Sequence, residues 1–219
     1  AKFMQFFAGK LGLSEEEKAY GQEAEETKRY WNETFVEKET GRTKCADGSI
    51  CDVQGSYSTG LSCDVFDERY TEAAFGHLAR KTKEGDFTIR SGFFGTDPIN
   101  PMLSLGGFSD LAYRMITQTK YPSWLYPVTQ GATTIWERWN SFTEEDGFGE
   151  NNSMNSFNHY SLGSVVNWLY ENVLGIRRDE AYPGYKHFIL KPEIGGFDWA
   201  KGGIDTPHGR IESAWERRG

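Results

Sequence analysis

The sequence predicts a mainly α-helical chain of stacked helical hairpins that ends in a short β segment. Three observations support this fold class. Apolar residues recur at helical spacing through most of the chain, glycine-containing turns separate the helical stretches, and the pattern changes near residue 184. A rhythm of helix, glycine turn and helix is typical of helical hairpins that pack side by side. We therefore assign residues 1–182 to a helical part and residues 183–219 to a partial β segment.

The helical stretches follow one another with one long interruption. Residues 40–62 are rich in Gly, Ser, Asp and Thr, which is typical of a connection with turn chemistry. We expect the last helix to end at Gly175, because glycine commonly terminates helices. The predicted helices cover residues 14–38, 67–83, 101–106, 110–119 and 156–175, with a helical or turn-like stretch at 133–140.

The β segment is small. Strand candidates cover residues 185–192, 197–203 and 210–215, with Gly and Pro turns between them. Two or three strands are rarely stable alone, so we expect this segment to dock against the helical part or to be the start of a larger sheet.

The composition excludes several classes of partner. The formal net charge is −8, which argues against a nucleic-acid backbone or an anionic membrane surface and favours a neutral ligand. Aromatic residues make up 15% of the chain, enough to line a binding cleft with ring faces. No apolar run is long enough to span a bilayer. The first ten residues already resemble a helix, so we expect the chain to start inside a longer protein, and the missing leader peptide assigns no compartment.

Neither a metal site nor a cofactor is predicted. The spacing of Cys45, Cys51 and Cys63 matches no zinc motif, and no nucleotide-binding glycine motif occurs. Cys45 and Cys51 flank a turn and could close a small disulfide, although three unrelated thiols are the favoured interpretation.

One stretch carries residues suited to sugar chemistry. Glu137 lies between Trp136 and Trp139. An aromatic face can stack on the apolar face of a pyranose while a carboxylate handles protons at the anomeric centre. If the stretch is helical, the two indoles point apart and only one faces a ligand. The alternative is a surface pair of Glu137 and Arg138 on an ordinary helix.

Further candidates lie on either side of this stretch. His159 and Asn155 would share a helical face and could bind sugar hydroxyls or an attacking water, whereas the alternative for His159 is a residue that caps a helix start. Trp124 lies within residues 121–127, where two prolines are expected to fix an extended stretch, and its ring is either a platform for a sugar or part of the core. Phe93 and Phe94 lie between glycines, where core packing is favoured over the lining of a cleft.

Four motifs, taken in order, resemble the bacterial α-L-rhamnosidases of glycoside hydrolase family seventy-eight. The similarity is dense from residue 85 to residue 216 and looser upstream. The motifs are Tyr121-Pro122-Ser123-Trp124, Gly131-Ala132-Thr133-Thr134-Ile135-Trp136-Glu137-Arg138-Trp139, Met154-Asn155-Ser156-Phe157-Asn158-His159-Tyr160 and Pro183-Gly184-Tyr185-Lys186-His187.

The resemblance implies a fold and an activity. The catalytic domain of the family is an (α/α)6 barrel followed by a C-terminal β-sandwich, and it removes terminal α-L-rhamnose from rhamnosides with inversion. The resemblance makes Glu137 the general base and His159 an active-site histidine. It places Trp124, Trp136 and Trp139 near the sugar pocket, and it implies no cofactor.

The resemblance also leaves a gap. The general acid of the family lies in an acidic segment on an earlier hairpin, and this sequence contains no such segment. The chain supplies about half of a barrel, so we expect either a fragment that needs a complementing chain segment or a short relative that forms a homo-oligomer. Two alternatives stay open: a degenerate module that binds rhamnose without turnover, and an (α/α)-barrel hydrolase for another sugar.

Overall fold

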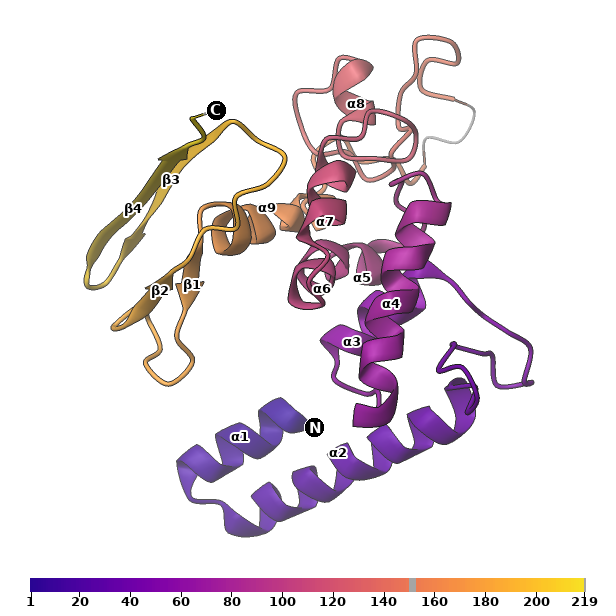
Figure 1. Cartoon of the computed structure of the whole chain (residues 1–219), viewed down its shortest axis with the longest axis vertical. Helices are drawn as coiled ribbons and strands as arrows, with labels where there is room; N and C mark the ends of the chain where they lie inside the picture. Colours follow the sequence, from indigo (N-terminus) through magenta and orange to yellow (C-terminus); the bar gives the residue numbers. More distant parts are fainter. Residues whose placement is uncertain (150–152, 219) are drawn as a thin grey trace.

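The computed structural model describes residues 1–149 and 153–218, and it is mainly helical with two small antiparallel sheets near the C-terminal end (Figure 1). This confirms the predicted fold class. The helical elements are α1 (Lys2–Leu11), α2 (Ser14–Phe35), α3 (Gln54–Ser62), α4 (Glu68–Glu84), α5 (Phe93–Thr96), α6 (Ile99–Leu105), α7 (Ser109–Ile116), α8 (Tyr126–Thr129), η1 (Ser161–Ser164), α9 (Val165–Trp168) and η2 (Leu169–Val173). The strands are β1 (Ile176–Arg178), β2 (Phe188–Leu190), β3 (Trp199–Thr206) and β4 (Gly209–Glu216).

The core lies between α3, α4, α6, α7 and α9. Tyr57, Leu78, Leu103 and Trp168 are fully buried there, and each comes from a different helix. The α1–α2 hairpin extends along one side of the molecule (Figure 1). It is tied to the core through Asn32, whose side chain donates to the carbonyl of Val65 over 2.7 Å.

Helix α3 replaces part of the connection that the sequence predicts over residues 40–62, so that prediction is wrong from Gln54 onwards. Its glycines and serines have low intrinsic helix propensity, but they allow close packing. A Cβ atom at Gly60 would lie 2.6 Å from the ring of Phe66, and one at Gly55 would lie 2.9 Å from the Cβ of Ser91. Tertiary packing therefore overrides propensity in this segment.

The connection before α3 folds back on itself as a small hairpin, in which Lys44 pairs with Ile50. All three cysteines are free thiols. Burial and a hydrogen bond with the thiol of Cys45 raise the pKa of Cys51, so these two thiols are neighbours while Cys63 lies apart in sequence.

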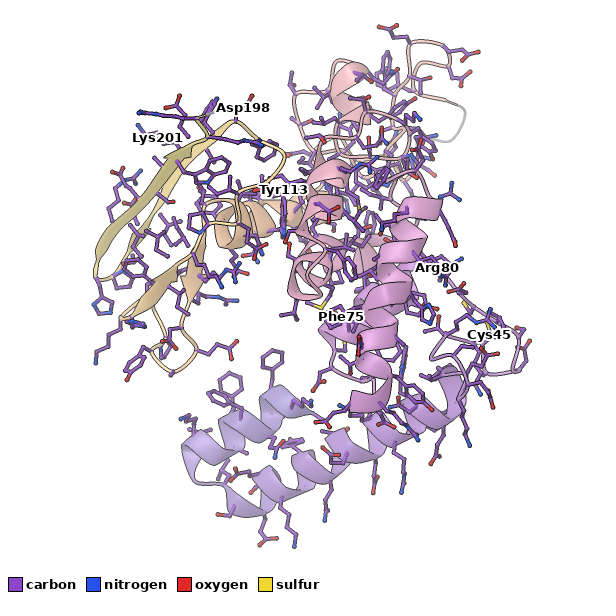
Figure 2. All side chains as sticks on the ribbon, viewed as in Figure 1. Cys45, Phe75, Arg80, Tyr113, Asp198 and Lys201 are labelled. Carbon is purple, nitrogen blue, oxygen red and sulfur yellow. The ribbon has the colours of Figure 1, made fainter. Side chains whose placement is uncertain are left out.

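A carboxylate ties this connection to α4. Asp52 accepts a hydrogen bond from the hydroxyl of Tyr57, two bonds of 2.9 Å from Arg80, and an ion pair of 3.0 Å from Lys81. Arg80 lies on the side of α4 that faces the loop carrying Cys45 (Figure 2). Partial burial would raise the pKa of Asp52, but these bonds outweigh burial and lower the pKa from 3.8 to about 2.

Acid should therefore weaken the fold through Asp52. A carboxyl whose pKa is depressed in the folded state contributes stability above its unfolded pKa and loses it as the pH falls through the folded pKa. We expect the free energy of unfolding lost by Asp52→Asn to be about 2 kcal/mol at pH 5 and about half of that at pH 3. Urea denaturation at both pH values measures this. Asp198→Asn, at a side chain that is 96% exposed, is the control, and a pH-independent loss at Asp52 would contradict the prediction.

The β segment consists of two hairpins. Strands β1 and β2 pair with Ile176 opposite Leu190, and β3 and β4 pair with Thr206 opposite Gly209. The first strand, which begins at Ile176, lies ahead of the strands that the sequence predicts. The sequence pattern does not reveal it because three residues are too few to show a period. The observed β2, β3 and β4 overlap the predicted strands.

The β segment docks on the helical part. The indole of Trp215 donates to the carbonyl of Val173 over 2.7 Å, and the hydroxyl of Ser213 donates to the carbonyl of Leu174 over the same distance. Tyr113 on α7 lies where the helical body meets the chain that leads into β3 (Figure 2), and its ring packs edge-on against Phe197 at 5.1 Å. These contacts extend the helical core into the sheet.

Helix α1 exposes an apolar face. Phe3, Phe6, Phe7 and Leu11 are all more than half exposed. Within the described parts of the chain, no helix combines the length and apolar character needed to cross a membrane.

Candidate active site

The segment around Glu137 is a series of bends and turns, not a helix. It runs beside a second loop, and the two are joined by backbone hydrogen bonds. The N–H of Glu137 donates to the carbonyl of Ser156 over 2.9 Å, and the N–H of His159 donates to the carbonyl of Ile135 over 2.8 Å. Two loops distant in sequence therefore position the candidate residues.

The helix predicted over residues 156–175 begins only at Ser161, so its first part is wrong. The reason lies in the same hydrogen bonds, which use the backbone groups of Ser156 and His159 across the loops instead of within a helical turn. Asn155 and His159 consequently do not share a helical face. The amide of Asn155 instead donates to the carbonyl of Ser141 over 2.9 Å and fixes the loop.

Glu137 lies in the wall of a surface hollow of about 310 Å³. One carboxylate oxygen, Oε2, accepts a hydrogen bond of 2.8 Å from the N–H of Ser156, which fixes the orientation of the group. The rest of the wall comes from three separate loops, the first residue of α5 and the start of η1. The lining residues are Ser91, Gly92, Phe93, Tyr121, Glu137, Arg138, Trp139, Asn140 and Leu162.

His159 is not among the residues that line this hollow, but it contacts one of them. Its ring stacks on Phe93 at 5.0 Å and 18°, and on Tyr160 at 5.8 Å and 10°. Its Nδ1 accepts a hydrogen bond of 3.3 Å from the N–H of Ser161. The neutral ring therefore carries its proton on Nε2, which is a donor for a ligand hydroxyl.

The three tryptophans have different environments. Trp139 lines the hollow. Trp124 packs edge-on against Trp139 at 6.0 Å, and its indole donates to the carbonyl of Leu162 over 2.8 Å. Trp136 is buried, with its ring edge-on to Phe157 at 5.4 Å. Of the two indoles beside Glu137, only Trp139 lines the hollow, and Trp124 supports it from behind.

Some lining residues lie outside the set of pocket residues that the sequence favours. Phe93, for which core packing was favoured, is 41% exposed and lines the hollow, and Phe94 is 92% exposed, so the core interpretation is wrong for both. Tyr121 is the first residue of one motif, and Asn140 directly follows Trp139, the last residue of another, so these positions were the available signal.

The hollow combines an oriented carboxylate and a guanidinium, from Glu137 and Arg138, with ring faces and a carboxamide. This set suits a small neutral polyol: the rings contact C–H faces and the polar groups bind hydroxyls. Within the described residues, no group of three or more His, Cys, Asp or Glu side chains is arranged to hold a metal ion.

Two family models match consecutive parts of the chain. The one described as the bacterial alpha-L-rhamnosidase 6 hairpin glycosidase domain matches residues 1–173, and the one described as the bacterial alpha-L-rhamnosidase C-terminal domain matches residues 175–219.

Individual relatives agree with these matches. An alpha-L-rhamnosidase from Formosa agariphila is 35% identical over 99% of this chain and 22% of its own length. One from Streptomyces avermitilis is 37% identical over 79% of this chain and 17% of its own length. The chain thus spans about a fifth of the length of the relatives that it matches.

Solved structures show the same architecture. The α-L-rhamnosidase of Streptomyces avermitilis complexed with L-rhamnose superimposes with a TM-score of 0.85 at 31% identity, over 98% of this chain and 20% of that one. The native enzyme from Aspergillus terreus gives 0.86 at 29% identity, over 97% of this chain and 24% of that one. The chain therefore belongs to the bacterial α-L-rhamnosidase family of six-hairpin glycosidases.

Proposed function

We propose that this chain supplies the general base and part of the sugar pocket of an α-L-rhamnosidase that hydrolyses terminal α-L-rhamnosides with inversion. The observation that carries the proposal is the Glu137 carboxylate, held by the Ser156 N–H in the wall of a hollow beside Trp139. A relative with the same fold binds L-rhamnose, which supports the choice of sugar.

The proposed reaction is a single displacement. Glu137 takes a proton from a water molecule as the oxygen of that water attacks the anomeric carbon. The bond from this carbon to the leaving oxygen breaks on the opposite face, so the configuration inverts. The leaving oxygen receives a proton from a general acid, which we assign to a complementing chain segment.

The other pocket residues bind the sugar or hold the binding residues in place. Trp139 offers a ring to the C–H face and methyl group of rhamnose, while Trp124 holds that ring in place. Trp136 and Asn155 act by packing and by fixing the loops. The Nε2 proton of His159 is available to a sugar hydroxyl.

The complementing segment needs a surface to dock on. The apolar face of α1 supplies one, because Phe3, Phe6 and Phe7 are exposed there. A second copy of the chain is the alternative occupant, and sedimentation of the isolated chain distinguishes self-association from a monomer.

Titration with L-rhamnose tests the pocket. We expect Trp139→Ala to weaken binding about tenfold, because loss of an aromatic contact removes on the order of 1–2 kcal/mol. Isothermal calorimetry on the whole chain measures this. Trp199→Ala on β3, at an exposed indole, is the matched control, and equal affinity in all three proteins would contradict the pocket assignment.

The two alternatives give different results. A degenerate binding module would bind L-rhamnose but hydrolyse no rhamnoside, even one with an activated leaving group. A hydrolase for another sugar would fail to bind L-rhamnose and would cleave a different member of a panel of aryl glycosides.

A further inference from the structure

A second hollow adjoins the one around Glu137. It has a volume of about 400 Å³, and the two hollows share Tyr121 and Asn140 in their walls, whereas Glu137 belongs only to the first. The two hollows are therefore neighbours on the surface, with Tyr121 and Asn140 between them. The second hollow is lined by Tyr121, Tyr126, Gln130, Asn140, Thr143, Glu144, Glu145 and Asp146.

One end of the second hollow is aromatic. Tyr121 is more than half exposed, and its ring packs edge-on against Tyr126 at 5.2 Å and 73°. The hydroxyl of Ser123 accepts a hydrogen bond of 3.2 Å from the N–H of Tyr126, which fixes the start of α8. An exposed ring held in this way can contact the C–H face of a pyranose.

The other end is an acidic turn with a defined shape. Thr143 and Gly147 pair through two backbone hydrogen bonds of 3.0 and 2.9 Å, so Glu144, Glu145 and Asp146 form the tip between them. The side chain of Gln130 accepts a bond of 3.0 Å from the N–H of Glu144 and anchors the turn beside α8. The carboxylates are thereby kept at the rim of the hollow.

No basic side chain is among the described residues that line this hollow, so the three carboxylates are not neutralised within it. Ionised carboxylates only accept hydrogen bonds, and they match ligands that are rich in hydroxyl donors. They also repel a ligand that carries a carboxylate of its own.

We propose that the second hollow binds the sugar ring to which the L-rhamnose is attached, and that its acidic rim selects a neutral hexopyranose over a uronic acid at this position. The inference rests on the proposed function, because it places the rhamnose ring beside Glu137. Tyr121 contacts both rings, and Glu144, Glu145 and Asp146 determine the charge specificity.

Three ligands test separately whether the second hollow binds a sugar ring and whether its acidic rim selects a neutral one. Calorimetry on the whole chain compares methyl α-L-rhamnoside, α-L-rhamnosyl-glucose and α-L-rhamnosyl-glucuronate at pH 7. We expect the neutral disaccharide to bind about tenfold tighter than the methyl glycoside, and the uronate to bind about tenfold weaker than the neutral disaccharide. The second ratio should shrink in 0.5 M NaCl, because salt screens exposed charges.

A charge-removal variant tests whether the three carboxylates cause the preference for the neutral disaccharide. Glu144→Gln combined with Glu145→Gln and Asp146→Asn should bring the affinities for the two disaccharides to within about twofold of each other. The matched control removes three adjacent exposed carboxylates elsewhere, by Glu15→Gln, Glu16→Gln and Glu17→Gln at the start of α2, and should leave the tenfold ratio in place. Circular dichroism establishes that both variants are folded.

The outcomes are distinct. If methyl α-L-rhamnoside binds but both disaccharides bind no tighter, the second hollow is not a sugar site and the proposed function stands. If the uronate binds as tightly as the neutral disaccharide, or if both triple variants change the ratio equally, the acidic rim does not select. If methyl α-L-rhamnoside itself does not bind, the proposed function fails and this inference fails with it.

Discussion

Replacement of Glu137 by glutamine is expected to slow the hydrolysis of dinitrophenyl α-L-rhamnoside by about 10²–10⁴-fold. Dinitrophenolate leaves without being protonated, so this substrate removes the need for a general acid and isolates the role of the base. Glutamine keeps the shape of the side chain, and its carbonyl oxygen can still accept the hydrogen bond from Ser156. The loss therefore reports proton transfer, and release of the coloured phenolate measures it.

Two controls distinguish catalysis from structure. Glu212→Gln, at an exposed carboxylate on β4, should hydrolyse the substrate at the wild-type rate, and Glu137→Gln should still bind L-rhamnose within about threefold of the wild type.

Azide added to Glu137→Ala should restore turnover and give β-L-rhamnosyl azide, because the anion attacks from the face that the base serves. An α-azide, or a Glu137→Gln rate equal to that of the wild type, would exclude Glu137 as the base of an inverting reaction.

The second large effect concerns the core. Trp168→Ala is expected to lower the free energy of unfolding by about 3–5 kcal/mol, because it removes a large, fully buried side chain. The indole donates to the hydroxyl of Ser104 over 2.9 Å and packs edge-on against Tyr113 at 5.2 Å, so the substitution also removes the contact that each of these residues makes with the indole. The loss is a large fraction of the stability of an ordinary domain.

Urea denaturation measures this effect. Trp199→Ala, which truncates the same residue type at a site that is 66% exposed, should cost about 1 kcal/mol or less. Ser104→Ala should cost about 1–3 kcal/mol, because it leaves a buried N–H without its acceptor. Equal losses at Trp168 and Trp199 would mean that the buried indole is not part of the stabilising core.

Periodicity predicted the elements that bury one regular face. The helix predicted over residues 67–83 is observed at Glu68–Glu84, and the strand predicted over 210–215 at Gly209–Glu216. Helix α3 could not be predicted in this way, since its small residues are helical only because Phe66 and Ser91 pack closely against them. The helix predicted from residue 156 starts late because hydrogen bonds to a distant loop, invisible in a local pattern, compete for its first turn.

In the candidate site, too, some residues could be predicted from the local sequence and others depend on tertiary structure. The motif pointed to Glu137, Trp139 and their neighbours because they are adjacent in sequence. Tyr121, in a loop, and Phe93, at the start of α5, lie 16 and 44 residues upstream of Glu137, and only the folded chain brings them to the same hollow. Residue-level patterns thus identify a candidate base, whereas the shape of the hollow and its acidic extension depend on tertiary structure.

The contacts between η2 and β4 limit how the helical part and the β segment can be exchanged by recombination. The two family models meet at residue 174, yet Trp215 and Ser213 on one side bond to the carbonyls of Val173 and Leu174 at the junction itself. A recombination event that joined the helical part to a β segment without Trp215 and Ser213 would leave these two carbonyls without their donors, and it would remove the Trp215 ring that packs against the helical core. The helical part and the β segment are therefore constrained to evolve as partners, although their sequences match separate models.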